Sequence, residues 1–156
     1  MHMLKLNNKA FTLTELLMVV LMIGILSAVA LPKFTRVVDS FRVLEAEQIM
    51  TSVRGEQETR CTLGKKYTVF ASKLGVLSNN KASGETYTTD NFTYTLNGSG
   101  IGATSPKGYT LEMPSYLDGR ICCDECGGFT KNYLTCDELR NLEDFQKIEN
   151  DDACKS

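Results

Sequence analysis

Six cysteines are the residues of this chain best suited to redox, metal or cross-linking chemistry. Cys123 and Cys126 have the two-residue spacer of redox and zinc motifs, but the adjacent Cys122 and the scarcity of His fit neither motif. In an exported domain an even number of cysteines favours disulfides, up to three of them with fifteen ways of pairing. A structural zinc site and a redox centre are the alternatives, and we expect no metal and no other cofactor. The disulfide candidates are Cys61, Cys122, Cys123, Cys126, Cys136 and Cys154.

Glu15 stands out because it is the one ionisable side chain between Phe11 and Leu31. The nineteen residues of Leu13–Leu31 would span roughly 28 Å as a helix, close to the thickness of a bilayer's hydrocarbon core. A carboxylate costs about 2.5–3.5 kcal/mol at mid-membrane, so Glu15 is a candidate for function. Lys5 and Lys9 precede the apolar run without an acidic neighbour, which favours a cytoplasmic N-terminus and an oxidising compartment for the rest.

The residues around Glu15 form a recognisable motif. The stretch from Lys9 to Leu17, KAFTLTELL, followed by an apolar helix with Gly24 and Ala30-Leu31-Pro32, resembles the start of type IV prepilins and pilin-like proteins. In that family a prepilin peptidase cuts a short basic leader just before a Phe and then N-methylates the new amino group. The resemblance implies a cut between Ala10 and Phe11, with Ala10 standing where the family nearly always has Gly.

The resemblance also implies how the chain assembles. Glu15 of one subunit would pair with the buried N-terminal amine of Phe11 on a neighbour, and so set the axial register of a helical filament. Gly24 and Pro32 would be the places where the helix kinks or melts on packing, although Gly24 equally suits close helix contact in the membrane. The implied partners are other copies of the chain, the prepilin peptidase, the pilus assembly machinery and the inner membrane.

Charge and composition narrow the function further. Removing residues 1–10 leaves 15 basic against 19 acidic residues, a formal charge of −4, which argues against general nucleic-acid binding. The same cut removes His2, the only His, so the mature chain has no Ser–His or Cys–His pair for nucleophilic catalysis. We therefore expect no enzyme. The true start, Met1 or Met3, stays open.

We expect four segments along the chain. These are a leader at 1–10, a transmembrane and filament-core helix at 11–32, its amphipathic continuation at 33–60 and a globular head at 61–156. Apolar residues recur at helical spacing in the third segment, at Phe34, Val37, Val38, Phe41, Leu44, Ile49, Met50 and Val53.

The head changes to a period of two, which is typical of strands. Three or four strands are expected in an antiparallel meander, with Asn97-Gly98 as a strong turn signal after the first. Thr135 and Glu138 form a capping box for a short helix to about Leu142. The fold class is therefore α+β, a long N-terminal helix packed on a small antiparallel head with a disulfide-pinned C-terminal region. The expected strands lie at 91–96, 101–104, 109–113 and 119–123.

Three functions fit these features. The first is a subunit of an extracellular type IV pilus, held as a single-pass inner-membrane protein before assembly. Adhesion, twitching, DNA uptake and conductivity remain open as its use. The second is a type II secretion pseudopilin, whose relatives bind calcium with acids such as Asp124, Glu125, Asp151 and Asp152 here. The third is a secreted disulfide-rich binding domain, released by signal peptidase near Ala30.

Overall fold

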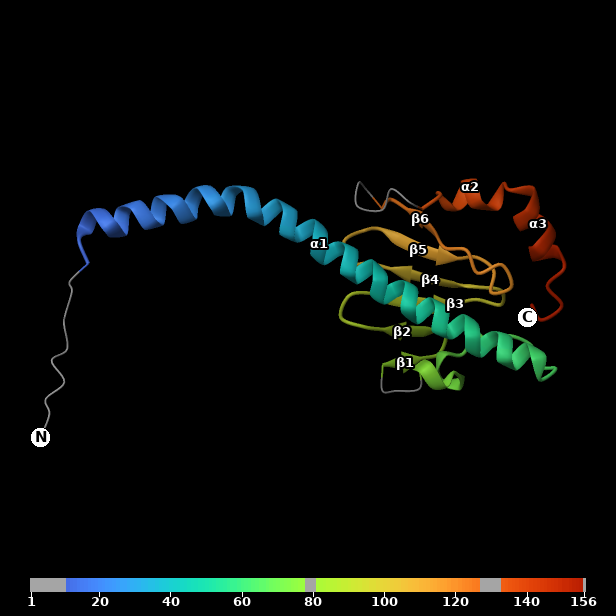
Figure 1. Cartoon of the computed structure of the whole chain (residues 1–156). Helices are drawn as coiled ribbons and strands as arrows, with labels where there is room; N and C mark the ends of the chain where they lie inside the picture. Colours follow the sequence, from blue (N-terminus) through green and yellow to red (C-terminus); the bar gives the residue numbers. More distant parts are fainter. Residues whose placement is uncertain (1–10, 78–80, 127–132, 156) are drawn as a thin grey trace, which may run out of the picture. The chain divides into compact units, whose positions relative to one another are not determined.

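The computed structural model describes residues 11–77, 81–126 and 133–155. The chain divides into two compact units, one ending at Val38 and one starting at Asp39. The second unit holds all the strands and the short helices (Figure 1). The elements are α1 (Leu13–Thr62), the 3₁₀ turns η1 (Ala71–Lys73) and η2 (Gly75–Leu77), β1 (Ala82–Ser83), β2 (Thr86–Thr88), β3 (Thr93–Leu96), β4 (Ile101–Thr104), β5 (Thr110–Met113), β6 (Cys122–Asp124), α2 (Cys136–Arg140) and α3 (Glu143–Asn150).

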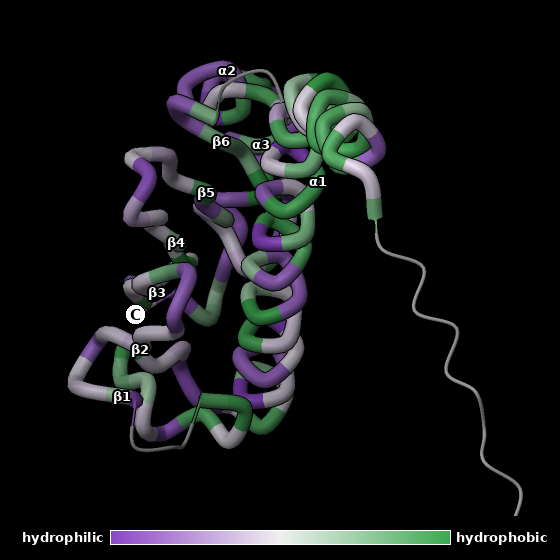
Figure 2. The backbone as a smooth tube through the Cα atoms, turned by 90° about the vertical axis from the view of Figure 1, so that its left-hand side faces the viewer, coloured by the Kyte–Doolittle hydropathy of each residue, from purple (hydrophilic) through white to green (hydrophobic). Residues whose placement is uncertain are grey.

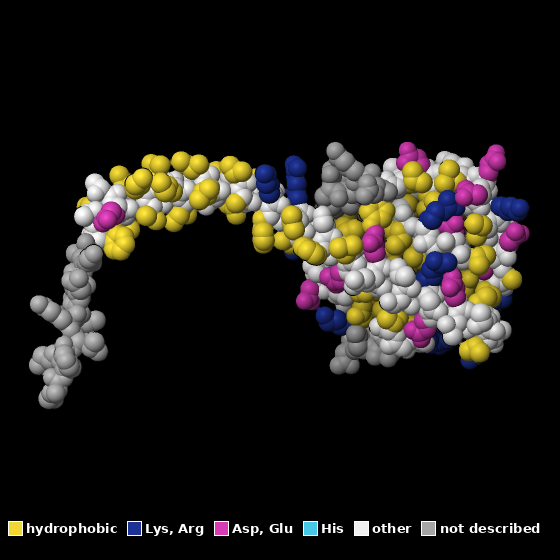
Figure 3. Space-filling view, in the orientation of Figure 1, with side chains coloured by type: hydrophobic (Ala, Val, Ile, Leu, Met, Phe, Trp, Pro, Cys, Tyr) yellow, Lys and Arg dark blue, Asp and Glu magenta, His cyan; other side chains and the backbone are white. Residues whose placement is uncertain are grey.

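The long N-terminal helix is confirmed, with bounds two residues later than the sequence predicted at each end. Helical structure runs through both Gly24 and Pro32, so neither residue interrupts α1 in the single subunit. From Leu13 to Leu31 nearly every apolar side chain is exposed, and Figure 3 shows them on all visible sides of this segment. By length and composition α1 is suited to cross a membrane.

The sheet is a six-stranded antiparallel meander in the order β1-β2-β3-β4-β5-β6. The meander is confirmed, but the expected number of three or four strands was too low. β1 and β2 are only two and three residues long, which is too short for an alternating pattern to appear in the sequence. The last strand begins at Cys122 rather than at Gly119, because residues 114–121 form turns against the helix.

The core of the second unit lies between the sheet and the head half of α1, which we define as Asp39–Thr62. One stripe of the helix is buried, at Val43, Ala46, Met50, Val53 and Gln57. Figure 2 shows the strands along one side of this part of the helix. The facing row of the sheet is set by the register Tyr87, Tyr94, Ala103, Leu111 and Cys123, all of them buried.

Gln57 is the polar exception in the buried stripe and is fully satisfied. Its Nε2 donates to the Thr68 carbonyl at 2.6 Å, and its Oε1 accepts from the Thr68 amide at 3.0 Å. This amide pair fastens the segment after α1 back onto the helix. Replacing such a group would leave two buried backbone groups unpaired, at about 1–3 kcal/mol each.

The C-terminal region packs as a second small cluster of Cys122, Cys136, Leu139 and Phe145. The predicted capping box is confirmed, with Thr135 as N-cap and Glu138 closing it, although α2 ends at Arg140 rather than at Leu142. The bonds from Thr135 also lower the pKa of the Glu138 carboxyl. The helix α3 was not predicted, because its eight residues bury a single large side chain, Phe145.

Buried tyrosines make the head sensitive to alkali. Burial raises the pKa of Tyr67 to about 12, with nearby Asp152 adding to the shift, and raises the pKa of Tyr94 and Tyr116 as well. Unfolded tyrosine ionises near about pH 10, so above that pH the folded state holds more protons than the unfolded state. Stability is therefore full below about pH 10 and lost as the pH rises through about 12.

The measurement is thermal unfolding across this range, with tyrosinate absorbance recorded in parallel. We expect the midpoint to fall steeply above about pH 10, and most of the absorbance to appear together with unfolding. Ionisation of most tyrosines in a still-folded head would contradict this prediction.

Candidate functional site

Glu15 and Phe11 lie at the beginning of α1. Phe11 precedes the helix and is 81% exposed. The Glu15 carboxylate accepts hydrogen bonds from the Thr12 amide and the Thr12 hydroxyl, both at 2.9 Å, while the Glu15 amide donates to the Thr12 hydroxyl at 3.2 Å. These contacts form a capping box that starts the helix. Ala10, the other half of the expected cleavage site, lies outside the described residues.

The capping role of Glu15 is a feature that our sequence reasoning missed. The T-x-x-E signal of Thr12 and Glu15 was present, and it is the same signal that we used for Thr135 and Glu138. In the single subunit Glu15 thus has a local structural role. A role in assembly has to be separated from it by experiment.

The head half of α1 has an unusual distribution of charge. Its exposed residues are all uncharged, and its charged residues are all only partly exposed. We call the exposed set the charge-free face. It consists of Ser40, Phe41, Leu44, Gln48, Thr51, Ser52, Gly55, Thr59 and Thr62. The charged residues are Asp39, Arg42, Glu45, Glu47, Arg54, Glu56, Glu58 and Arg60.

Several of these charged side chains are turned toward the head and held there. Arg54 donates to the carbonyl of Tyr116 at 2.6 Å and to that of Leu117 at 3.1 Å. The Glu56 carboxylate accepts from the amides of Gly75 and Val76, at 2.6 and 3.1 Å. These bonds draw charge away from the outward side of the helix.

Other charges on the flanks of the helix follow the same pattern. Glu45 accepts from the Asn91 amide at 2.6 Å, and Asp39 pairs with Lys107 and Arg42. Burial raises the pKa of the Glu47 carboxyl, as expected for a carboxylate partly withdrawn from water.

The charge-free face lies opposite the buried stripe, because its members are offset from that stripe by half a turn. Two of them are large apolar residues left in water, Phe41 at 67% exposed and Leu44 at 48%. A helix whose outer side stays in solvent carries its charges there. The arrangement found here is the reverse, and suits a face that another apolar surface covers.

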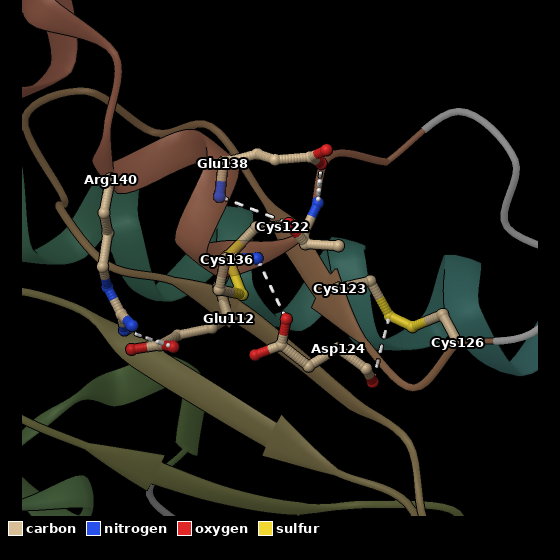
Figure 4. Close-up of a disulfide and its surroundings, with 9 residues drawn as sticks. Glu112, Cys122, Cys123, Asp124, Cys126, Cys136, Glu138 and Arg140 are labelled. Carbon is tan, nitrogen blue, oxygen red and sulfur yellow. Dashed lines mark hydrogen bonds and ion pairs between the residues drawn. A yellow bond between two sulfur atoms is a disulfide. The ribbon is translucent and has the colours of Figure 1, made fainter.

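The structure pairs all six cysteines and leaves none free. Cys61 on the last turn of α1 is bonded to Cys154, Cys122 to Cys136, and Cys123 to Cys126 (Figure 4). The first bridge joins the end of α1 to the C-terminal segment, where the Tyr67 amide also donates to the Cys154 carbonyl at 3.0 Å. Disulfides thus pin the C-terminal region, as the fold prediction stated.

The described residues bring one group of potential metal ligands together, Glu112, Cys122 and Cys136, with ligand atoms within 4.8 Å of one another. Both sulfurs belong to the same disulfide, so neither is a thiolate that a metal could bind. Glu112 is also engaged, accepting from Arg140 at 2.6 Å (Figure 4). This group is therefore a structural junction between β5, β6 and α2.

The acids that the sequence offered as calcium ligands do not form such a group among the residues described. Asp124 accepts from the Cys136 amide and Asp152 from the Cys154 amide, each at 3.0 Å. Their carboxylates thus hold the backbone next to bonded cysteines. Glu125 lies beside Asp124 in a left-handed backbone conformation with φ of 59°.

Comparison with known proteins gives one relevant similarity. The chain is 34% identical over 69 residues to the type IV major pilin protein PilA of Myxococcus xanthus (strain DK1622). The match covers 44% of this chain, and the chain spans 31% of that pilin's length. No protein-family model and no solved structure matches the chain. The similarity supports a pilin-like structural protein, in agreement with the long helix and the disulfide-pinned head.

Proposed function

We propose that this chain is a structural subunit of an extracellular type IV pilus filament and has no enzymatic activity. The observation that carries the proposal is the charge-free face of α1, which exposes Phe41 and Leu44 where a solvated helix would carry charge. The similarity to a type IV major pilin supports it independently. In a filament, the face would lie against other copies of the chain.

In this proposal the apolar part of α1 first holds the subunit in the inner membrane. The prepilin peptidase cuts between Ala10 and Phe11 and methylates the new amine, and the pilus assembly machinery then moves the helix from lipid into the filament core. Glu15 pairs there with the Phe11 amine of a neighbour. Gly24 and Pro32 allow α1 to adapt as helices come together. No nucleic acid and no metal takes part.

A charge placed on the face tests the proposal. The Phe41→Glu variant would bury an unpaired carboxylate at every subunit contact, at a cost of several kcal/mol. We expect its filament yield to fall at least about tenfold, since about 1.4 kcal/mol already corresponds to that factor. The measurement is electron microscopy of material sheared from cells, with the amount of subunit in the membrane fraction as reference.

Thr93→Glu is the matched control, because Thr93 is exposed on the sheet side facing away from the buried row. It adds the same charge to the head away from α1 and should leave filaments abundant. Normal filaments from Phe41→Glu would overturn the assignment of this face. N-terminal sequencing of the wild-type subunit separates the alternatives, since Phe11 as first residue supports a pilin and Leu31 a secreted domain.

A further inference from the structure

The turn between β3 and β4 concentrates hydrogen-bond donors on one amide oxygen. The Oδ1 of Asn97 accepts from the Ser99 amide at 3.0 Å, from the Gly100 amide at 2.5 Å and from the Ser99 hydroxyl at 3.3 Å. Asn97 itself is exposed to solvent. Nothing in the proposed assembly of the filament uses this cluster.

The turn is held rigidly in this form by the rest of the head. The Asn97 amide donates to the Gly100 carbonyl at 3.0 Å, and the Tyr116 amide donates to the Ser99 carbonyl at 2.7 Å. Gly100 is packed so closely that a Cβ there would lie 2.1 Å from the Met113 carbonyl oxygen. The donors therefore stay aimed at Oδ1 without further reorganisation.

Donors fixed on a carbonyl oxygen stabilise the negative charge that develops there when the carbonyl carbon is attacked. A nucleophile is built into the chain, because the backbone nitrogen of Gly98 can close a five-membered ring onto Cγ of Asn97. Glycine at this position adds no side chain that would obstruct ring closure. The cluster thus has the parts of an oxyanion hole around an intramolecular reaction.

We propose that Asn97 and Gly98 form a self-modifying site, at which the folded head promotes deamidation of its own Asn97. The Gly98 nitrogen gives up its proton and bonds to Cγ, and the oxygen of the resulting adduct is held by Ser99 and Gly100. The bond from Cγ to Nδ2 then breaks, ammonia leaves with that proton, and a succinimide remains. Water opens the ring at either carbonyl, which yields aspartate or isoaspartate at position 97.

The two products affect the turn differently. Aspartate retains an oxygen that accepts from Ser99 and Gly100, so the turn persists with one added negative charge. Isoaspartate inserts a methylene into the backbone between β3 and β4 and disturbs their register, which places Leu96 opposite Ile101. The site would therefore add charge to, and loosen, the heads of long-lived subunits.

The test follows the purified full-length chain in detergent, incubated folded in water enriched in heavy oxygen, by peptide mass mapping. We expect deamidation and label at Asn97, about tenfold faster than in the same chain reduced and unfolded in urea, because the donors are fixed only in the fold. Ser99→Ala removes the hydroxyl donor and should slow the native reaction, while Gly98→Ala should slow it in both states.

Asn91 is the internal control in the same spectra. Its Nδ2 donates to Glu45 at 2.6 Å and it precedes the bulky, buried Phe92, so it should keep its amide. Loss of the Asn97 amide more slowly in the folded chain than in urea would overturn the proposal, as would loss no faster than at Asn91. The readout is a peptide mass, so it does not depend on whether the chain forms filaments.

Discussion

Replacing Glu15 with Gln is expected to stop filament assembly while leaving the start of α1 intact. Gln can close a capping box with Thr12 as Glu does, so the local structure seen here should persist. What the substitution removes is the charge proposed to neutralise the Phe11 amine of a neighbour. An amine left unpaired in the filament core costs about 3–5 kcal/mol per subunit, which is enough to prevent polymerisation.

Thr12→Ala is the complementary variant, because it removes the N-cap and keeps the carboxylate. Loss of such a cap costs about 1 kcal/mol, a small amount for a helix as long as α1. We expect Thr12→Ala to assemble and Glu15→Gln to accumulate unassembled in the membrane fraction, as judged by electron microscopy of sheared material and by subunit counts in membranes. Glu15→Val, which lacks both functions, should behave as Glu15→Gln does.

The opposite pattern would be equally informative. If Glu15→Gln forms filaments normally and Thr12→Ala does not, the importance of Glu15 lies in starting the helix. The proposed pairing with Phe11 would then be wrong, while the charge-free face would still stand on its own test. The two variants thus separate the role visible in the single subunit from the role proposed in the filament.

The long helix and the meander were predictable because their signals are long and periodic. The apolar run to Leu31 and the stripe that follows extend over many turns, and β3 and β5 each show a period of two. Short elements give no such signal. β1, β2 and α3 exist because neighbouring strands and the Phe145 contact stabilise them, so they could be found only from the tertiary structure.

The charge-free face was missed for a different reason. The sequence analysis followed apolar residues along the helix and treated the charges between them as its solvated side. Phe41 and Leu44 were counted with the packing stripe, but the structure buries Val43 and Ala46 and leaves those two outside. Tracing the positions without charge, rather than those that are apolar, would have revealed the face, although not which side the sheet covers.

Cysteine pairing was also beyond the sequence, which allowed fifteen connectivities. The fold decides it by bringing chain segments together. The tail after α3 returns to the last turn of α1, where Cys61 and Cys154 have Cα atoms 5.6 Å apart, and β6 and α2 place Cys122 and Cys136 at 4.9 Å. Only a known topology could rank these pairs.

The three bridges are expected to differ in their contribution to stability in the order of the loops they close. Cys61 and Cys154 are separated by 93 residues, Cys122 and Cys136 by 14, and Cys123 and Cys126 by 3. Loop-closure entropy then gives about 4.7, 3 and 2 kcal/mol for the three, respectively. Replacing both cysteines of a pair with Ala removes one bridge at a time and leaves no free thiol.

Urea unfolding of the full-length chain in detergent, followed by tyrosine fluorescence, measures the three losses. The Cys61–Cys154 variant should lose the most, because that bridge alone ties the end of α1 to the tail covalently. Lys66→Met is its matched control, since it removes the bond from Lys66 to the Ala153 carbonyl at 2.7 Å but keeps the bridge, and should cost under about 1 kcal/mol. Equal losses from the longest and the shortest loop would show that residual structure in the unfolded chain, rather than loop closure, determines what each disulfide contributes.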